Sequence, residues 1–376
     1  MAIRVVDLFS GAGGTSCGLR LAGMLPIAAV DIDAGALETY AANFPEAKTI
    51  AADIRRVEVR DLLGVVDRIG RGDGLLLAAC APCQPFSRQN RQKRELDERA
   101  DLLGEVVRFV EGLKPEFILV ENVPAIREQH RPSTGPLDAF LRQIADLGYA
   151  FDVHTIQVAD YGVPQNRPRL VVLASRLGPV SLPAASHGPG LTPHATVRDA
   201  IGHLPAIAAG MEDPSVPNHR AAGLSEINLA RIRATPHEAD RRSWPDELRL
   251  ACHRTAAGYT DTYGRMAWDR PAPALTTRCI SISNGRFAHP CQDRAISVRE
   301  AAALQSFPDD FVFKGSLDAM ARQIGNAVPP LLAARLADAF APRQSRAAST
   351  AGEPPPFSNH PDVVRWEQAS SANIRP

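Results

Sequence analysis

The chain has 376 residues, of which 45% are hydrophobic and 22% charged, and its 42 basic residues balance 42 acidic ones. These proportions are ordinary for a soluble globular protein, and the length allows two or three domains. No apolar run approaches the roughly 20 residues of a membrane-spanning helix, and the first residues lack the layout of a secretory signal. We therefore expect a cytoplasmic protein without a membrane partner. The six cysteines are too scattered for a disulfide framework or a zinc site, so we expect no metal.

Short apolar runs alternate with helical patterns in the first half of the chain, which is typical of a parallel sheet covered by helices. We predict strands at 3–9, 26–32, 47–53, 74–80 and 115–122. Helices are predicted between them, at 14–23, 34–43, 98–112 and 136–147. Segments 151–158 and 168–175 are expected to extend the edge of the sheet. The predicted fold class is α/β, with a doubly wound, mostly parallel sheet.

Beyond residue 177 the sequence becomes rich in Pro, Gly, His and Arg and loses clear periodicity. We therefore predict a first domain at 1–177 and a second, smaller and irregular domain at 178–293. Asn284-Gly285 lies between alternating residues, which predicts a two-residue hairpin turn. Helices are expected to return in 294–341, where Ser297 and Glu300 form a capping box. The remaining residues, 342–376, have the composition of a disordered tail.

A glycine-rich turn follows the first predicted strand. In VVDLFSGAGGTSCGL (5–19), the strand runs through Gly11, Gly13 and Gly14 into a helix. Glycines let a ligand approach the backbone closely, and a helix N-terminus offers free N–H groups. The spacing misses the dinucleotide-binding pattern, because Ser16 stands where the third glycine would be. The turn therefore indicates a ligand site of another kind.

Two aspartates end the next two predicted strands. Asp31 is placed for the hydroxyls of a ribose, and Asp53 could accept a hydrogen bond from an adenine amino group. With the glycine turn, they favour a nucleoside-type ligand. The alternative is a tight turn and two helix N-caps.

Cys83 lies just beyond the fourth predicted strand, in GLLLAACAPCQPFS (74–87). Ligands bind at the carboxyl ends of strands in open parallel sheets, and cysteine is a strong nucleophile near neutral pH. Cys80 makes the segment a Cys-x-x-Cys, although it falls within the strand and suits a small buried residue. Spacing alone leaves three alternatives open: a nucleophile, a redox pair or an inert thiol.

Glu121 ends the fully apolar strand FILVEN (117–122). A carboxylate in such surroundings favours a protonated or proton-sharing form, whereas a turn-capping residue is the alternative. Arg167 and Arg169 open the last predicted strand two positions apart, so in an extended chain both lie on one face. They suit an anion or a carbonyl acceptor, and a solvated edge is the alternative.

In this order, the motifs resemble those of the bacterial DNA cytosine-5 methyltransferases. DLFSGAGG (7–14), APCQPFS (81–87), ENV (121–123) and QNRPR (165–169) match the family's cofactor loop, nucleophile loop, glutamate motif and arginine motif. RAISVREAAALQSFP (294–308) and QIGNAVPP (323–330) match its two closing motifs. The resemblance covers about 1–175 and 290–340. It implies that S-adenosylmethionine binds at Phe9, Ser10, Gly11, Ala12, Gly13, Gly14, Asp31, Ile32, Asp53, Ile54, Pro82, Asn326 and Ala327.

The resemblance also implies a mechanism on double-stranded DNA. The Cys83 thiolate attacks carbon 6 of a cytosine flipped out of the duplex, Glu121 supplies a proton at ring nitrogen 3, and Arg169 binds the ring's carbonyl oxygen. Arg167 is expected among the catalytic residues as well. Gln84, Ser87, Arg88 and Arg91 are expected to contact DNA. The family relation implies a monomer with a restriction-modification role beside a companion endonuclease, or a solitary DNA-methylation role.

Two residues depart from the family pattern: Asp31 replaces the commoner glutamate, and Cys80 stands where glycine is usual. Residues 214–286 hold eleven Arg against seven Asp and Glu, which suits a DNA-reading region or a solvated surface. Three rival functions are a tRNA cytosine-5 methyltransferase, a catalytically inactive DNA-binding relative and a thiol oxidoreductase. The Cys-Phe-Thr tripeptide of the tRNA branch does not occur in the chain.

Overall fold

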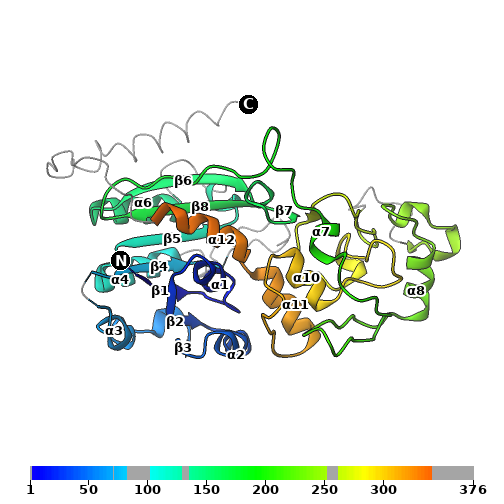
Figure 1. The fold of residues 1–376 in the computed structure, drawn as a ribbon, viewed down its shortest axis with the longest axis horizontal. Helices are drawn as coiled ribbons and strands as arrows, with labels where there is room; N and C mark the ends of the chain where they lie inside the picture. The colour runs from blue at the N-terminus through cyan, green and yellow to red at the C-terminus, as the bar shows by residue number, and fades with distance from the viewer. Residues whose placement is uncertain (1, 71, 83–101, 129–134, 252–260, 341–376) are drawn as a thin grey trace.

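The computed structural model describes residues 2–70, 72–82, 102–128, 135–251 and 261–340. A seven-stranded sheet forms the centre of one lobe, and a second, irregular lobe adjoins its edge (Figure 1). The strands lie in the order β3-β2-β1-β4-β5-β8-β6. Their bounds are β1 Ile3–Leu8, β2 Leu25–Asp31, β3 Lys48–Ala51, β4 Gly74–Ala79, β5 Phe117–Asn122, β6 Ala150–Gln157 and β8 Pro168–Ser175.

Parallel pairing joins β3, β2, β1, β4 and β5, whereas β8 runs antiparallel to both of its neighbours. β4 and β5 are buried along their whole length, which explains the unbroken apolar runs at 74–79 and 117–120. The predicted doubly wound, mostly parallel sheet is therefore confirmed, and the two later segments do extend its edge. Within the described residues, each predicted helix of the first half is present: α1 Gly14–Leu21, α2 Ala34–Asn43, α4 Leu102–Leu113 and α6 Pro136–Asp146.

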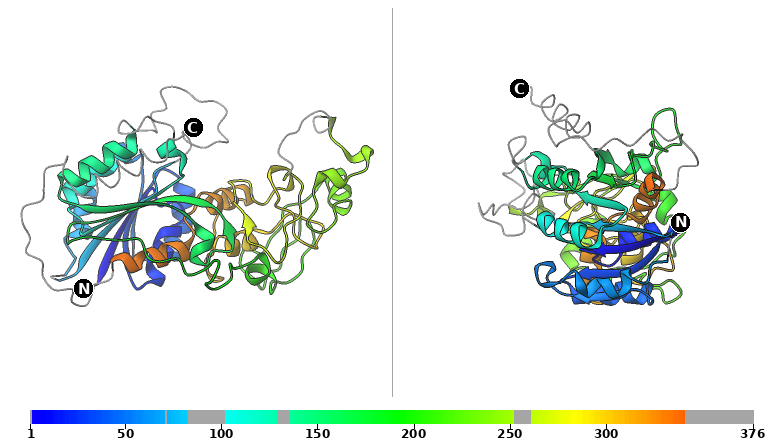
Figure 2. Two further views of the ribbon diagram at one scale, coloured as in Figure 1. Left: turned by 90° about the horizontal axis from the view of Figure 1, so that it is seen from above. Right: turned by 90° about the vertical axis from the view of Figure 1, so that its left-hand side faces the viewer.

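Helices cover both faces of the sheet (Figure 2). On one face, α4, α6 and α3 (Arg60–Val66) pack against the alternate strand residues Leu75, Leu77 and Ala79. On the other face, α1, α12 (Pro330–Leu336) and the 3-10 helix η7 (Ala337–Phe340) pack against Leu76 and Ala78. The two-residue alternation of side chains along each strand thus supplies both cores.

The end of the chain returns to the first lobe through α10 (Val298–Leu304), α11 (Leu317–Asn326) and α12. The predicted capping box is confirmed, because Ser297 accepts from the Glu300 N–H and Glu300 accepts from the Ser297 N–H. Glycines on α1 make room for this return: a Cβ added at Gly14 would lie 3.1 Å from the Ala327 Cβ and would clash with the Val328 carbonyl. The closing motif at 323–330 therefore lies directly against the glycine-rich turn at residues 9–14, called the glycine loop below.

The second lobe contains little regular structure, namely α7 (Val197–Ile201), α8 (Glu226–Arg233), η4 (Arg241–Ser243), η5 (Asp246–Leu248) and η6 (Ile282–Asn284). It has a small core of its own, in which Ile232, Trp244, Tyr263 and Ile282 pack together. The two-residue strand β9 (Ala272–Pro273) pairs with β7 (Gln165–Asn166) and joins the lobes. Shorter elements of the first lobe are η1 (Ile54–Arg56), α5 (Ala125–Glu128) and η3 (Val158–Tyr161).

The hairpin predicted at Asn284-Gly285 is wrong. These residues end or follow the 3-10 turn η6, and no strand flanks them among the described residues. Ile280 and Ile282 are both buried, and each fixes an irregular loop to the core. Their alternation with polar residues therefore does not indicate one face of a strand. The predicted tail at 342–376 lies outside the described residues. Of the helices described, none has the length and apolar character required to traverse a bilayer.

Candidate active site

The order of the strands reverses between β1 and β4. The chain passes from β1 outward to β2 and β3 and then returns to β4 on the other side of β1. Ligands of open α/β sheets bind at such a switch point, beyond the carboxyl ends of the strands. The glycine loop follows β1, Cys80 follows β4 and Glu121 lies near the end of β5. These residues are therefore gathered along the carboxyl ends of the strands, which we call the carboxyl edge of the sheet, or simply this edge.

The glycine loop has an unusual backbone. Phe9 and Gly11 have φ values of 57° and 52°, and the Gly11 N–H donates to the Asp31 carboxylate at 2.7 Å. A side chain at Gly11 would meet no protein atom within 4 Å, so the loop is open on that side. The Ser10 hydroxyl is buried without a hydrogen-bond partner in the described part of the chain. Since buried hydroxyls are normally paired, the loop suits a polar ligand group.

Asp31 does more than end β2. Its carboxylate accepts from the Gly11 N–H and from the Asp33 N–H, and burial raises the pKa of this carboxyl above its ordinary value. Asp31 therefore holds the glycine loop in place. The next residue, Ile32, is 71% exposed, which is unusual for an isoleucine and leaves an apolar surface beside the loop.

Asp53 and Ile54 lie at the third strand end, with different surroundings from those expected. Both Asp53 carboxylate oxygens accept from the Arg55 guanidinium, and this pairing lowers the Asp53 pKa to about 2. The Ile54 side chain is buried in the core beneath α4. An adenine amino group would thus share Asp53 with Arg55, and the Ile54 side chain faces the core.

Asp7 belongs to the same edge but escaped the sequence analysis. It is fully buried on β1, accepts from the Ser16 hydroxyl at 2.7 Å, and Ser16 in turn contacts the Tyr40 hydroxyl at 2.8 Å. Burial raises the pKa of Asp7 to about 7. The sequence signal was its place within DLFSGAGG, two residues before Phe9. The chain of three hydroxyl and carboxyl groups supports the glycine loop from below.

Glu121 and Arg169 form an ion pair at the center of this edge. The Arg169 Nε lies 2.5 Å from a Glu121 carboxylate oxygen, and each side chain is 11% exposed. The strand register explains the encounter, because β5 pairs with β8 and both side chains leave the end of that pair. A second contact holds the neighbouring loop: the Asn122 amide donates to the Ala81 carbonyl at 3.1 Å. Ala81 stands two positions before Cys83.

Cys80 lies between the glycine-loop side and the Glu121 side of this edge. Its sulfur contacts the Thr15 hydroxyl at 3.5 Å. Burial raises its thiol pKa well above the ordinary value, and the Glu121 charge acts in the same direction. A thiol with a raised pKa is a poor nucleophile, so Cys80 suits the predicted structural role. Cys83, Gln84, Ser87, Arg88 and Arg91 lie outside the described residues, whereas Pro82 is half-buried.

Arg167 points away from Glu121, although only one residue separates it from Arg169. Its guanidinium donates to the Leu275 carbonyl at 2.6 Å and to the Gly325 carbonyl at 2.8 Å. Gln165 adds two bonds, accepting from the Leu275 N–H and donating to the Gln305 side chain. This buried network ties the start of β8 to the second lobe and to α11.

The closing motif completes the edge. Gln305 donates to the Ala327 carbonyl at 2.5 Å, which fixes the residue after Asn326. Asn326 itself is exposed, and Ala327 is half-buried against the glycine loop. The structure therefore brings Ala327 to the loop at residues 9–14, with Asn326 next to it in the chain. No cluster of three metal-binding side chains occurs among the described residues.

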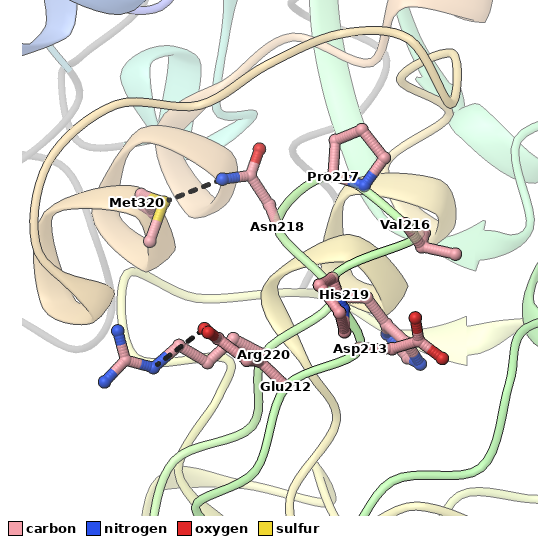
Figure 3. A pocket seen from close by; sticks show the side chains of 9 residues that line it. Glu212, Asp213, Val216, Pro217, Asn218, His219, Arg220 and Met320 are labelled. Carbon is pink, nitrogen blue, oxygen red and sulfur yellow. Dashed lines mark hydrogen bonds and ion pairs between the residues drawn. The ribbon is translucent and has the colours of Figure 1, made fainter.

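A pocket of about 260 Å³ lies elsewhere, between residues 212–220 and α11 (Figure 3). Glu212 and Arg220 face each other across part of it at 3.9 Å, and the Asn218 amide contacts the Met320 sulfur at 3.5 Å. Its polar groups thus engage one another.

Residues 3–341 match the family model of the C-5 cytosine-specific DNA methylases. The chain is 38% identical over 334 residues to the type II methylase M.HgiDII of Herpetosiphon aurantiacus, covering 87% of this chain and 92% of that protein. It is 36% identical over 342 residues to the type II methyltransferase M1.HphI of Haemophilus parahaemolyticus, covering 90% and 87%.

Solved structures share the fold. A protein described as a prophage-encoded DNA modification methyltransferase (E. coli) matches with a TM-score of 0.69 at 24% identity, covering 90% of this chain and 98% of the other. A mutant of Spodoptera frugiperda DNMT2 matches with a TM-score of 0.60 at 16% identity, covering 90% and 99%.

Proposed function

The chain belongs to the C-5 cytosine-specific DNA methylase family, and on that premise we propose which of its residues carry out the methylation of cytosine at carbon 5. The observation that carries the assignment is the Glu121–Arg169 pair at the end of β5 and β8. Asn122, the residue after Glu121, bonds the Ala81 carbonyl and so holds the segment that leads to Cys83.

Cys83 is the nucleophile. Carbon 5 of cytosine reacts poorly with a methyl donor, but attack of a thiolate at carbon 6 converts the ring to an enamine whose carbon 5 is nucleophilic. Glu121 stabilises the charge that develops on the ring by sharing a proton with nitrogen 3. Once carbon 5 carries the transferred methyl group, a base removes the remaining carbon 5 proton, and elimination breaks the bond between sulfur and carbon 6 and returns the Cys83 thiolate.

Arg169 orients Glu121, since its Nε already bonds that carboxylate. Its Nη1 donates to the Pro168 carbonyl, and its Nη2 is left for the ring's carbonyl oxygen. Arg167 is a positioning residue, because its guanidinium bonds the main-chain carbonyls of Leu275 and Gly325. Both arginines were expected to be catalytic from the sequence, and only Arg169 keeps that role here.

S-adenosylmethionine supplies the methyl group when bound. The residues at the switch point fit such a ligand: Ser10 has a buried hydroxyl without a described partner, Gly11 faces open space and Ile32 offers an exposed apolar side chain. Ser10 and the loop N–H groups would hold the methionine end, Asp31 the ribose and Ile32 the adenine. Asn326 and Ala327 close the site from α11.

Residues 178–293 are the proposed target-recognition domain, between a catalytic domain at 1–177 and closing motifs at 294–341. The target base must leave the duplex to reach Cys83. Gln84, Ser87, Arg88 and Arg91 follow the nucleophile directly and would contact DNA at the flipped base. Because the relatives are named type II methylases, we place the protein in a restriction-modification system with a companion endonuclease, as a cytoplasmic monomer.

Transfer of a labelled methyl group to duplex DNA, with tRNA as the competing substrate, tests the activity. Cys83→Ser should abolish transfer, and the matched variant Cys80→Ala should keep most of it. DNA with 5-fluorocytosine should trap a covalent complex with the wild type. Labelling of tRNA alone, or loss of activity in Cys80→Ala with retention in Cys83→Ser, would refute the assignment. Bisulfite sequencing of DNA from expressing cells then reports the target site.

A further inference from the structure

Most arginines of the second lobe are already engaged within the protein. Arg265 donates to the carbonyls of Thr235, Ile232, His289 and Gln292, and Arg286 bonds Asp240, Asp261 and three carbonyls. Five more have described partners: Arg220, Arg231, Arg233, Arg242 and Arg249. Arg241 is buried, and residue 254 lies outside the described part. The arginine surplus of this lobe is thus largely structural.

Arg270 and Arg278 are the remaining arginines of this region, and neither has a side-chain partner among the described residues. Their surroundings differ. Arg270 follows Asp269, an acidic neighbour that pairs with Arg198. Arg278 is exposed in the turn at 275–280, whose other residues are uncharged. An uncompensated cation is the form that a phosphate backbone attracts.

The turn that carries Arg278 is held rigidly. The Leu275 carbonyl and N–H are bonded by Arg167 and Gln165, and the Thr276 main chain packs so closely on Gly325 that any side chain there would clash. The Cys279 N–H donates to the Thr276 carbonyl, which closes the turn. Cys279 is itself fully buried. Arg278 is therefore presented by a fixed backbone.

The same anchor ties the turn to the segment that leads into β8. Arg167 bonds Leu275, three positions before Arg278, and Arg167 is separated by one residue from Arg169, which bonds Glu121. Because the turn that carries Arg278 is already fixed, binding DNA would cost less conformational entropy than it would if the cation stood on a flexible loop.

We propose that Arg278 contacts the phosphate backbone of the DNA substrate next to the target base, and that the anchored turn 275–280 sets the position of that contact. The proposal rests on the proposed function, since it requires duplex DNA at this edge. It identifies the contact by charge and placement and assigns it to the backbone rather than to a base.

The test measures DNA binding by fluorescence anisotropy over a range of salt, together with methyl transfer. Arg278→Gln should raise the Kd and KM for DNA about 10-fold and reduce the slope of log K against log salt by about 0.9, as for one lost phosphate contact. kcat and the KM for S-adenosylmethionine should change less than about 2-fold. Arg278→Lys should restore most of the affinity, because a phosphate contact needs a positive charge rather than the paired N–H donors of a guanidinium.

Arg270→Gln is the matched control, which removes an equal charge from the same region and should leave the salt slope unchanged. An unchanged slope in Arg278→Gln, or an equal loss in Arg270→Gln, overturns the proposal. If Arg278→Lys fails to restore binding and the variant methylates altered sites, Arg278 contacts a base and the assignment to the phosphate backbone is overturned. Absence of methyl transfer by the wild type would instead refute the proposed function.

Discussion

Gly325 on α11 is the point where the second lobe touches the closing motif, and Gly325→Ala tests that contact. A Cβ at this position would lie 2.6 Å from the Thr277 nitrogen and closer still to the Thr276 carbonyl. These are main-chain atoms, which cannot rotate away as a flexible side chain would. Either the turn or the helix must move, and both Arg167 hydrogen bonds join these two segments.

The expected cost follows from three contributions. Overpacking costs about 1–3 kcal/mol, and weakening a buried hydrogen bond from a charged group adds about 1.5 kcal/mol. Alanine gains about 1 kcal/mol over glycine in a helix. We expect a net loss near 2 kcal/mol in the free energy of unfolding, together with a higher KM for DNA because the turn shifts.

Gly64→Ala is the matched control. Gly64 also lies in a helix, α3, but a Cβ there would meet nothing within 4 Å. This variant should therefore be more stable by about 0.5–1 kcal/mol. Urea unfolding followed by circular dichroism compares both variants with the wild type. If Gly325→Ala is as stable as Gly64→Ala, the close contact between α11 and the turn does not exist in solution.

Three further predictions concern single side chains. Burial lowers the pKa of His289 to about 4, so the folded protein keeps this ring neutral while the unfolded chain takes up a proton below about 6.5. The free energy of unfolding should therefore fall by about 3 kcal/mol as the pH drops from 6.5 to 4. His289→Gln should make this pH dependence less steep in urea titrations, and an unchanged pH dependence contradicts the reasoning. Arg167→Met leaves two buried carbonyls unpaired and should lower the free energy of unfolding by about 3 kcal/mol. Arg169→Met should lower kcat at least about 100-fold with a smaller loss of stability. If thermal melting shows the larger loss for Arg169→Met and kinetics the larger loss for Arg167→Met, the two roles are exchanged. Asp31→Asn should weaken S-adenosylmethionine binding about 10-fold by calorimetry, because the charge that holds Gly11 is lost, and an unchanged Kd would remove Asp31 from the site.

The sequence by itself determined the sheet and which charged residues stand at the ends of its strands. The strands β4 and β5 could be predicted because a strand buried on both faces must be apolar throughout. Glu121 and Asp31 could be singled out because a charged residue at the end of such a strand is rarely without a role. The capping box at Ser297 and Glu300 was likewise readable, since its partners are three residues apart.

Only the tertiary structure decided the partners of those side chains. Arg167 and Arg169 stand two positions apart, yet one bonds Leu275 and Gly325, more than 100 positions away, and the other bonds Glu121. The paired arginines of the second lobe and the irregular loop at Asn284 were hidden for the same reason. Local patterns report how a segment is buried, because burial depends on periodicity. Which group a buried charge meets depends on contacts between distant segments, and no local pattern encodes them.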